Sequence, residues 1–272
     1  MANTLTGTPA AAAIYVQVRE HAAALDAPPC LAAVSVGAQP DDRAYLRSIA
    51  LSAEGCGITV RPVPLPADCA PEALTDTLRA LSTDGAVHGV LLLRPLPEAL
   101  RAQELLDTLD ARKDVDGMTT ASLGALVTGA AGFAPCTAEA CMELLRAHGI
   151  DPADRRVTIV GRSLVIGRPA ALLLTRADAT VTLCHRKTPD LAARCRDADI
   201  LLAAAGAPGL ITTDFVLDAG ATALPDGTLR GDVAPDAAAI AVCTPVPGGI
   251  GSVTTALLLR HTVQAAENLR HF

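Results

Sequence analysis

The sequence lacks the features that would place the chain on a nucleic acid or in a membrane. It has 22 basic residues against 29 acidic ones, so its formal net charge is -7 and its pI is about 5.3. Without a basic field the chain is not suited to wrap a phosphate polymer, and we expect a small ligand and no nucleic-acid partner. No apolar run approaches the ~18 residues of a membrane span, and the N-terminus has no basic segment typical of a signal peptide. We therefore expect no membrane association and a cytoplasmic protein.

Cysteine pairs are absent and lysine is scarce. The eight cysteines form no Cys-x-x-Cys pair, and a chain of 272 residues buries a core without disulfide staples. Buried reduced thiols are therefore favoured over a metal or redox site, and we expect no metal. The only lysines are Lys113 and Lys187, so few positions offer an amine.

Short apolar runs alternate with helical segments along the whole chain. In the first half we expect helices over Thr8–Leu25, Asp41–Glu54, Pro66–Ser82 and Thr137–His148, strands over Cys30–Val36, Gly57–Val63 and Gly89–Leu93, and a polar turn at Lys113–Gly117 before a Gly/Ala-rich connection. In the second half we expect strands over Val157–Val160, Thr180–Cys184, Ile200–Ala204, Phe215–Asp218 and Ile240–Val242, and a helix over Val253–Asn268 capped by Ser252. This alternation predicts two α/β domains, each with a parallel sheet.

A glycine-containing turn follows the strand that opens the second half. The segment Val157–Pro169 reads as a buried strand, a turn with Gly161 and Gly167, and a helix with Pro169 in its first turn. Such a helix N-terminus attracts a pyrophosphate, because its N–H groups and dipole favour anions. The pattern departs from G-x-G-x-x-G, since Ser163 takes the second glycine's place, so an ordinary tight turn is an alternative.

Basic residues follow the next strand, at the position that distinguishes NAD from NADP. About 20 residues after the glycine turn, NAD enzymes place an acidic residue on the ribose, whereas NADP enzymes place arginine near the 2′-phosphate. Here Arg186 and Lys187 follow His185, and no acidic residue occurs before Asp190. With Arg162 they favour NADP, although a solvated charge cluster is the alternative.

Motifs along the chain resemble those of the methylenetetrahydrofolate dehydrogenase/methenyltetrahydrofolate cyclohydrolase family. The matching segments, in the family's order, are Val36-Gly37 followed by Tyr45, Pro95-Leu96-Pro97, Lys113-Asp-Val-Asp-Gly117, Pro135-Cys-Thr137, Gly161-Arg-Ser163, Gly167-Arg-Pro169, Ala179-Thr-Val-Thr182 with Cys184-His185, Gly231-Asp-Val233, and Thr244-Pro-Val-Pro-Gly-Gly249. The resemblance implies a catalytic domain over 1–143 and 254–272, an NADP-binding Rossmann domain over 144–253, a folate substrate and a homodimer.

The resemblance also implies which residues form the site. On the folate side it implies Tyr45, stacked on the aminobenzoyl ring, and Asp116, hydrogen-bonded to the pterin, as catalytic residues, with further substrate contacts from Leu93, Pro95, Pro245, Pro247, Gly248 and Gly249. On the cofactor side it implies Gly161, Arg162, Ser163, Gly167, His185, Arg186, Gly206, Ala221, Gly251 and Thr254. For Asp116 the alternative is a residue that only orders its turn, and for Tyr45 a half-buried helix residue.

Two polar groups of the family's active site are replaced by apolar residues. The family places a lysine four residues after the tyrosine and a glutamine before Pro-Leu-Pro, and these positions hold Ile49 and Leu93. Arg47 lies on another helix face and stays protonated at working pH, so it does not replace the lysine. We expect hydride transfer to persist and cyclohydrolase activity to be weak or lost, because hydrolysis needs proton transfers that a tunable amine supplies. The alternatives are a modified folate or pterin substrate in a specialised pathway, and a non-catalytic paralogue that binds NADP or folate.

Overall fold

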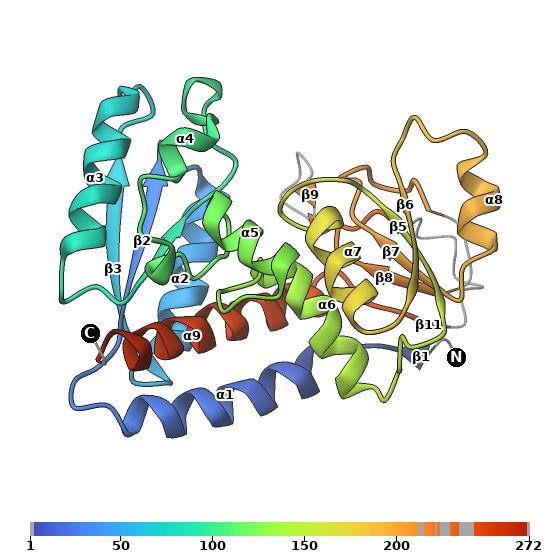
Figure 1. Cartoon of the computed structure of the whole chain (residues 1–272), viewed down its shortest axis with the longest axis horizontal. Helices are drawn as coiled ribbons and strands as arrows, with labels where there is room; N and C mark the ends of the chain where they lie inside the picture. Colours follow the sequence, from blue (N-terminus) through green and yellow to red (C-terminus); the bar gives the residue numbers. More distant parts are fainter. Residues whose placement is uncertain (1–2, 212–214, 221, 224–228, 234–241, 271–272) are drawn as a thin grey trace. The chain divides into compact units, whose positions relative to one another are not determined.

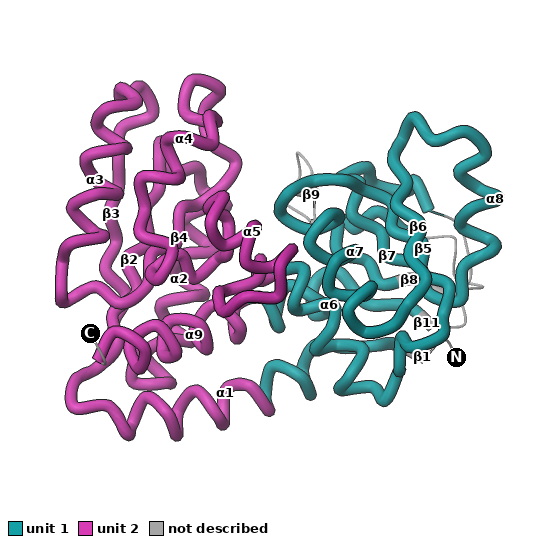
Figure 2. Tube along the Cα trace, in the orientation of Figure 1, with its two compact units in different colours: residues 1–12, 137–254 teal, residues 13–136, 255–272 magenta. Residues whose placement is uncertain are grey.

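The computed structural model describes residues 3–211, 215–220, 222–223, 229–233 and 242–270, and it divides into two compact units (Figures 1 and 2). Unit 1 comprises residues 1–12 and 137–254, and unit 2 comprises residues 13–136 and 255–272. Among the described residues, no helix is long and apolar enough to cross a membrane. The predicted two-domain α/β organisation is confirmed, whereas the exact domain bounds stay a prediction.

Unit 1 contains a six-stranded parallel sheet in the order β1-β11-β8-β7-β5-β6. Its elements are β1 Asn3–Thr4, β5 Arg156–Val160, α7 Gly167–Arg176, β6 Thr180–Cys184, α8 Leu191–Arg196, β7 Ile200–Ala203, β8 Phe215–Asp218, the β9 Thr222–Ala223 and β10 Leu229–Arg230 pair, and β11 Val242–Cys243, with α6 Cys136–Ala147 at its border. Central strands such as β7 are buried on both faces, as expected for a parallel sheet covered by helices.

Unit 2 contains a three-stranded parallel sheet in the order β3-β2-β4, with the C-terminal helix packed in the same unit. Its elements are most of α1 Thr8–Ala23, then β2 Cys30–Val36, α2 Pro40–Glu54, β3 Thr59–Leu65, α3 Pro71–Thr83, β4 Gly89–Leu92, the 3-10 turn Glu98–Leu100, α4 Gln103–Leu106, the 3-10 turn Ala111–Lys113, α5 Thr120–Thr128, and most of α9 Ile250–Leu269.

The structure differs from the sequence-based expectation in the connection after Gly117 and at the start of the C-terminal helix. The connection after Gly117 contains α5, which Thr119 caps by accepting a hydrogen bond from the Ser122 N–H and which ends at Gly129 in the left-handed region. Ser252 is not an N-cap, because α9 begins at Ile250 and the Ser252 hydroxyl donates instead to a carbonyl of the preceding turn. The expected strand Ile240–Val242 lies mostly outside the described residues, and β11 begins at its last position.

No disulfide links the eight cysteines, all of which lie in the described part of the chain. Five of them are buried, namely Cys56, Cys136, Cys141, Cys184 and Cys195. Among the described residues no three His, Cys, Asp or Glu side chains gather as a metal site.

Candidate functional site

The turn between β5 and α7 holds two glycines that allow close backbone packing. Gly161 has a φ of +141°, and a Cβ there would lie 2.0 Å from the carbonyl oxygen of Ala204. A Cβ at Gly167 would lie 2.0 Å from the carbonyl oxygen of Gly161. The late second glycine of the motif therefore lets α7 begin directly against the turn.

A pocket of about 340 Å³ opens beside this turn in unit 1. It is lined by Gly161, Arg162, Ser163, His185, Arg186, Lys187, Ala204 and Ala205. Three formal positive charges thus border one cavity, and among the described residues Arg162, Arg186 and Lys187 form no ion pair with a carboxylate. A cavity bordered by three cations that pair with no carboxylate of the described residues fits a ligand with several phosphates.

His185 is held by the backbone that follows β6. The Lys187 N–H donates to His185 Nδ1 at 3.1 Å, and the His185 N–H donates to Thr188 Oγ1 at 2.9 Å. Because a backbone N–H only donates, Nδ1 accepts, and a neutral His185 ring carries its proton on Nε2.

Three other predicted cofactor-side positions, Gly206, Gly251 and Thr254, do not line this pocket. Gly206 directly follows Ala205, which lines the pocket. Gly251 and Thr254 lie in the first turns of α9. The Gly206 N–H donates to the Asp232 carboxylate at 3.1 Å. Ala221 lies outside the described residues.

In unit 2, Tyr45 and Asp116 lie near each other although they come from α2 and from the turn after Lys113. Tyr45 is 39% exposed, and burial of its hydroxyl end raises its pKa, as does the neighbouring Asp116 carboxyl. The Thr255 side chain hydrogen-bonds the phenol. An aromatic ring with an open face next to a carboxyl group is suited to a planar, polar heterocycle.

Asp114, rather than Asp116, orders the Lys-Asp-Val-Asp-Gly turn. The buried Asp114 carboxylate accepts hydrogen bonds from the Thr119 N–H and the Ser122 hydroxyl, each at 2.7 Å. Gly117 has a φ of +66°, which favours glycine. A Cβ there would also lie 2.5 Å from the carbonyl oxygen of Phe133. Asp116 makes none of these bonds, so the turn does not account for its side chain.

Burial raises the pKa of Asp116 to about 7, and the Asp114 carboxylate adds to this effect. The charges of Arg94 and His261 act in the opposite direction, as does a hydrogen bond with Cys136. The carboxyl group therefore changes its charge near neutral pH.

The residues that surround Asp116 were not predicted from the sequence as site residues. Cys136 Sγ donates to the Val115 carbonyl at 3.2 Å, and His261 Nδ1 lies 2.8 Å from the same oxygen and 3.5 Å from the sulfur. Arg94 directly follows Leu93. These residues come from separate elements, so no spacing in the sequence indicates that they meet.

Ile49 and Leu93 are both buried in unit 2. Ile49, on α2 one turn after Tyr45, is 0% exposed, and Leu93, directly after β4, is 7% exposed. Pro95 follows Leu93 after one residue. The other predicted folate contacts, Pro245, Pro247, Gly248 and Gly249, lie in unit 1. A single folate site formed by both groups stays a prediction.

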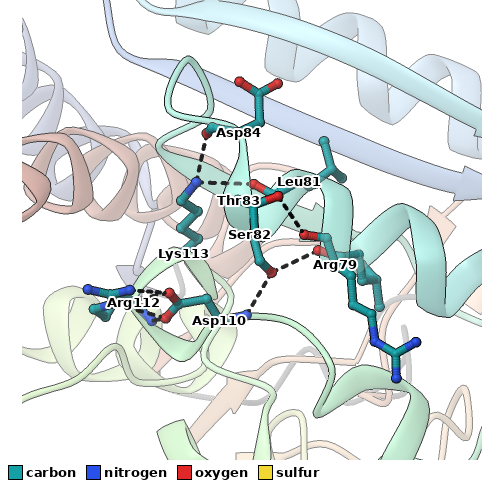
Figure 3. Close-up of polar contacts among 9 residues, drawn as sticks. Arg79, Leu81, Ser82, Thr83, Asp84, Asp110, Arg112 and Lys113 are labelled. Carbon is teal, nitrogen blue, oxygen red and sulfur yellow. Dashed lines mark hydrogen bonds and ion pairs between the residues drawn. The ribbon is translucent and has the colours of Figure 1, made fainter.

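Lys113 is the one lysine of unit 2, and backbone carbonyls engage its amine. Lys113 is 4% exposed, and its Nζ donates to the carbonyl oxygens of Leu81 at 3.1 Å and Asp84 at 2.8 Å, near the end of α3 (Figure 3). Its charge satisfies carbonyls at a helix C-terminus, where cations are favoured. Lys187 lines the pocket of unit 1. Lys113 is thus structural.

Two family models match the chain in succession. Residues 5–116 match the catalytic domain of tetrahydrofolate dehydrogenase/cyclohydrolase, and residues 135–270 match the NAD(P)-binding domain of the same family. The bifunctional protein FolD 1 of Rhodococcus jostii is 47% identical over 98% of this chain and 93% of its own length. The bifunctional protein FolD of Chloroflexus aurantiacus is 44% identical over 92% of this chain and 90% of its own.

Solved structures of FolD enzymes share the whole fold. The bifunctional FolD of Campylobacter jejuni is 35% identical with a TM-score of 0.92, and the alignment covers 99% of this chain and 100% of that one. The Trypanosoma brucei FolD, solved with NADP cofactor and inhibitor, is 34% identical with a TM-score of 0.92, covering 100% and 99%. These matches span both units, and the chain belongs to the tetrahydrofolate dehydrogenase/cyclohydrolase family.

Proposed function

We propose that the chain is an NADP-dependent 5,10-methylenetetrahydrofolate dehydrogenase whose methenyltetrahydrofolate cyclohydrolase activity is weak or absent. The observation that carries the dehydrogenase is the phosphate-binding pocket, lined by Arg162, Arg186 and Lys187, in the NAD(P)-binding domain of this family. The cofactor, when bound, supplies the hydride acceptor. The protein must align the methylene carbon of the folate with it, because two flanking nitrogens of the substrate already delocalise the resulting positive charge.

The loss of hydrolysis is supported by the apolar residues beside Tyr45. Hydrolysis adds water to the methenyl carbon and breaks one C–N bond, so protons must move to and from the reacting atoms. Ile49 and Leu93 carry no titratable group, and Lys113 is engaged by backbone carbonyls. Because both positions became apolar together, neither leaves a buried polar group without its partner.

The purified protein, mixed with methylenetetrahydrofolate and NADP, tests both parts. We expect NADPH and methenyltetrahydrofolate to accumulate in equal amounts, and the methenyl absorbance to decay no faster than in buffer. If neither product forms, the dehydrogenase is refuted and a non-catalytic paralogue or another pterin substrate remains. If both form and the methenyl signal decays in proportion to enzyme, the loss of cyclohydrolase is refuted.

A double variant ties the loss of hydrolysis to these positions. We expect Ile49→Lys with Leu93→Gln to gain enzyme-dependent decay of methenyltetrahydrofolate. Ala50→Lys with Leu93→Gln is the matched control. Residue 50 is exposed, so a lysine there adds the same charge on another face of α2. Equal gains in both variants would show that a general charge effect is responsible, and thermal unfolding of each variant checks that the buried lysine is tolerated.

Cofactor preference is tested at the pocket. We expect Arg186→Ala to weaken NADP binding by about ten- to a hundredfold, the loss of one charge-assisted hydrogen bond, with little effect on NAD. Arg196→Ala is the control, because Arg196 is exposed in the same unit and does not line the pocket. Equal losses for NAD and NADP would contradict a 2′-phosphate role for Arg186.

The homodimer and the cytoplasmic location expected from the sequence stay predictions. Light scattering of the purified chain measures the first, and cell fractionation of a tagged chain measures the second.

A further inference from the structure

The loop over residues 205–207, which follows β7 in unit 1, directs its backbone N–H groups onto one side chain. Asp232, 0% exposed, accepts hydrogen bonds at Oδ2 from Ala205 (2.6 Å) and Gly206 (3.1 Å) and at Oδ1 from Ala207 (2.6 Å). Three successive N–H groups are therefore satisfied by one buried carboxylate. Hydrogen bonds to a charged acceptor are among the stronger ones in proteins.

A second buried carboxylate holds Asp232 in place. Asp218, at the end of β8, accepts from the N–H groups of Gly220, Asp232 and Val233, each at 3.0 Å. Its own N–H donates to Thr244 Oγ1 at 2.7 Å. Asp218 thus connects the end of β8 to the segment that carries Asp232.

Two glycines leave the space that these carboxylates occupy. A Cβ at Gly220 would lie 2.4 Å from Asp232 Cγ, and a Cβ at Gly231 would lie 2.0 Å from Asp218 Oδ2. Any side chain at either position would displace a carboxylate. The positions of both carboxylates therefore depend on glycine at residues 220 and 231.

The order of strands places the 205–207 loop on one side of the cofactor pocket. In unit 1, β6 and β7 lie on opposite sides of β5 (Figure 1), and Ala204 and Ala205 line the pocket together with Arg186. In such sheets the dinucleotide lies across the carboxyl ends of the strands, with its pyrophosphate at the glycine turn. With the 2′-phosphate end beyond β6, the nicotinamide end extends toward β7.

We propose that Asp232 is a positioning residue for the nicotinamide half of NADP, acting through the 205–207 loop. By accepting all three N–H groups, the carboxylate fixes the wall of the pocket that follows β7. It also removes these donors from the pocket, so that the loop does not compete with Arg162, Arg186 and Lys187 for phosphate. This inference rests on the proposed NADP-dependent function.

The test compares the whole cofactor with its adenosine half. Calorimetry measures the binding of NADPH and of 2′,5′-ADP, which lacks the nicotinamide, to the wild-type chain and to Asp232→Asn. The asparagine side chain has about the same size as aspartate. Its N–H₂ group cannot accept a hydrogen bond, so at least one of the three backbone N–H groups loses its acceptor. We expect NADPH to bind about tenfold more weakly and 2′,5′-ADP to bind unchanged, with the KM for NADP raised and the KM for folate unchanged.

Two further variants separate positioning from stability. Gly220→Ala keeps the charge but pushes the Asp232 carboxylate away, so we expect the same selective loss of NADPH affinity. Asp199→Asn is the matched control, because Asp199 also accepts from a backbone N–H, that of Arg156 at 2.8 Å, at the opposite end of the sheet. It is expected to leave both affinities unchanged.

The outcomes distinguish this inference from the function on which it rests. If the wild-type chain binds neither ligand, the proposed cofactor and this inference both fail. If the wild type binds both ligands, the inference alone is overturned when Asp232→Asn weakens the binding of NADPH and of 2′,5′-ADP equally, or changes neither affinity. If Asp232→Asn does not fold, Gly220→Ala decides by the same comparison.

Discussion

Asp116 should control the pH dependence of folate turnover. Its pKa of about 7 means that the carboxyl group is about 10% ionised at pH 6 and about 90% ionised at pH 8. If the carboxylate accepts hydrogen bonds from the pterin, as the family resemblance implies, kcat/KM for the folate falls about tenfold from pH 8 to pH 6. In Asp116→Asn we expect kcat/KM to be about a hundredfold lower and independent of pH over this range.

The stability of the fold should change with pH in the opposite direction. Since the folded-state pKa of Asp116 lies above its unfolded value of 3.8, the folded state holds the proton more tightly. This contribution is fully present below the unfolded pKa and is lost as the pH rises through 7. A shift of about three pKa units corresponds to at most about 4 kcal/mol, and the partial exposure of Asp116 reduces this to about 2 kcal/mol. At pH 8, Asp116→Asn should therefore be more stable than the wild type by about 2 kcal/mol, and this difference should disappear near pH 4.

Two measurements check this reasoning. Steady-state rates at saturating NADP between about pH 5.5 and 8.5, a range chosen to bracket the expected pKa, give the kcat/KM profile, and urea unfolding extended down to about pH 4 gives the stability. NADPH affinity over this range is the control, because it separates a change in cofactor binding from a change at Asp116. A flat wild-type profile, or the same slope in Asp116→Asn, would refute the assignment of this titration to Asp116.

Three other substitutions test structural roles. Lys113→Met should cost about 3 kcal/mol in urea unfolding, because two carbonyls lose a charged donor, while kcat per folded molecule is retained; a large loss of kcat would indicate a catalytic lysine. Gly161→Ala should abolish NADPH binding in calorimetry, since its Cβ would lie 2.0 Å from the Ala204 oxygen, and unchanged affinity would contradict the tight turn. Asp114→Asn should cost about 2 kcal/mol through its bond to Ser122 and move the pH profile to lower pH, because the Asp114 carboxylate helps to raise the pKa of Asp116; an unmoved profile would contradict this coupling.

Local patterns in the sequence predicted several strands of both sheets. The strands β2, β6 and β8 have the predicted bounds, because each is a short run rich in apolar or β-branched residues that ends at a loop. Arg162, Arg186 and Lys187 were expected around one phosphate, and they line one pocket. In each case the signal lies within a few residues of the chain.

Features that depend on distant contacts were not predictable in this way. Asp218 and Asp232 are joined by contacts that only the folded sheet creates, and their flanking glycines look like ordinary turn residues in the sequence. The cluster around Asp116 combines elements far apart in the chain, such as Cys136 and His261. The helix α5 was missed because its apolar residues have little helical periodicity, although Thr119 is a recognisable N-cap.

In the proposed function, the charges near Tyr45 favour the methenyl product over its hydrolysis. Removing a hydride from the methylene group creates a cation, which an ionised carboxylate stabilises and a neighbouring ammonium group destabilises. Above pH 7 Asp116 supplies the negative charge, and Ile49 contributes none. The same replacement that removes the amine needed for hydrolysis thus also removes a charge that would oppose hydride transfer. On this reasoning, introducing lysine at position 49 raises hydrolysis and lowers the equilibrium yield of bound methenyl product, and both effects appear in one single-turnover experiment.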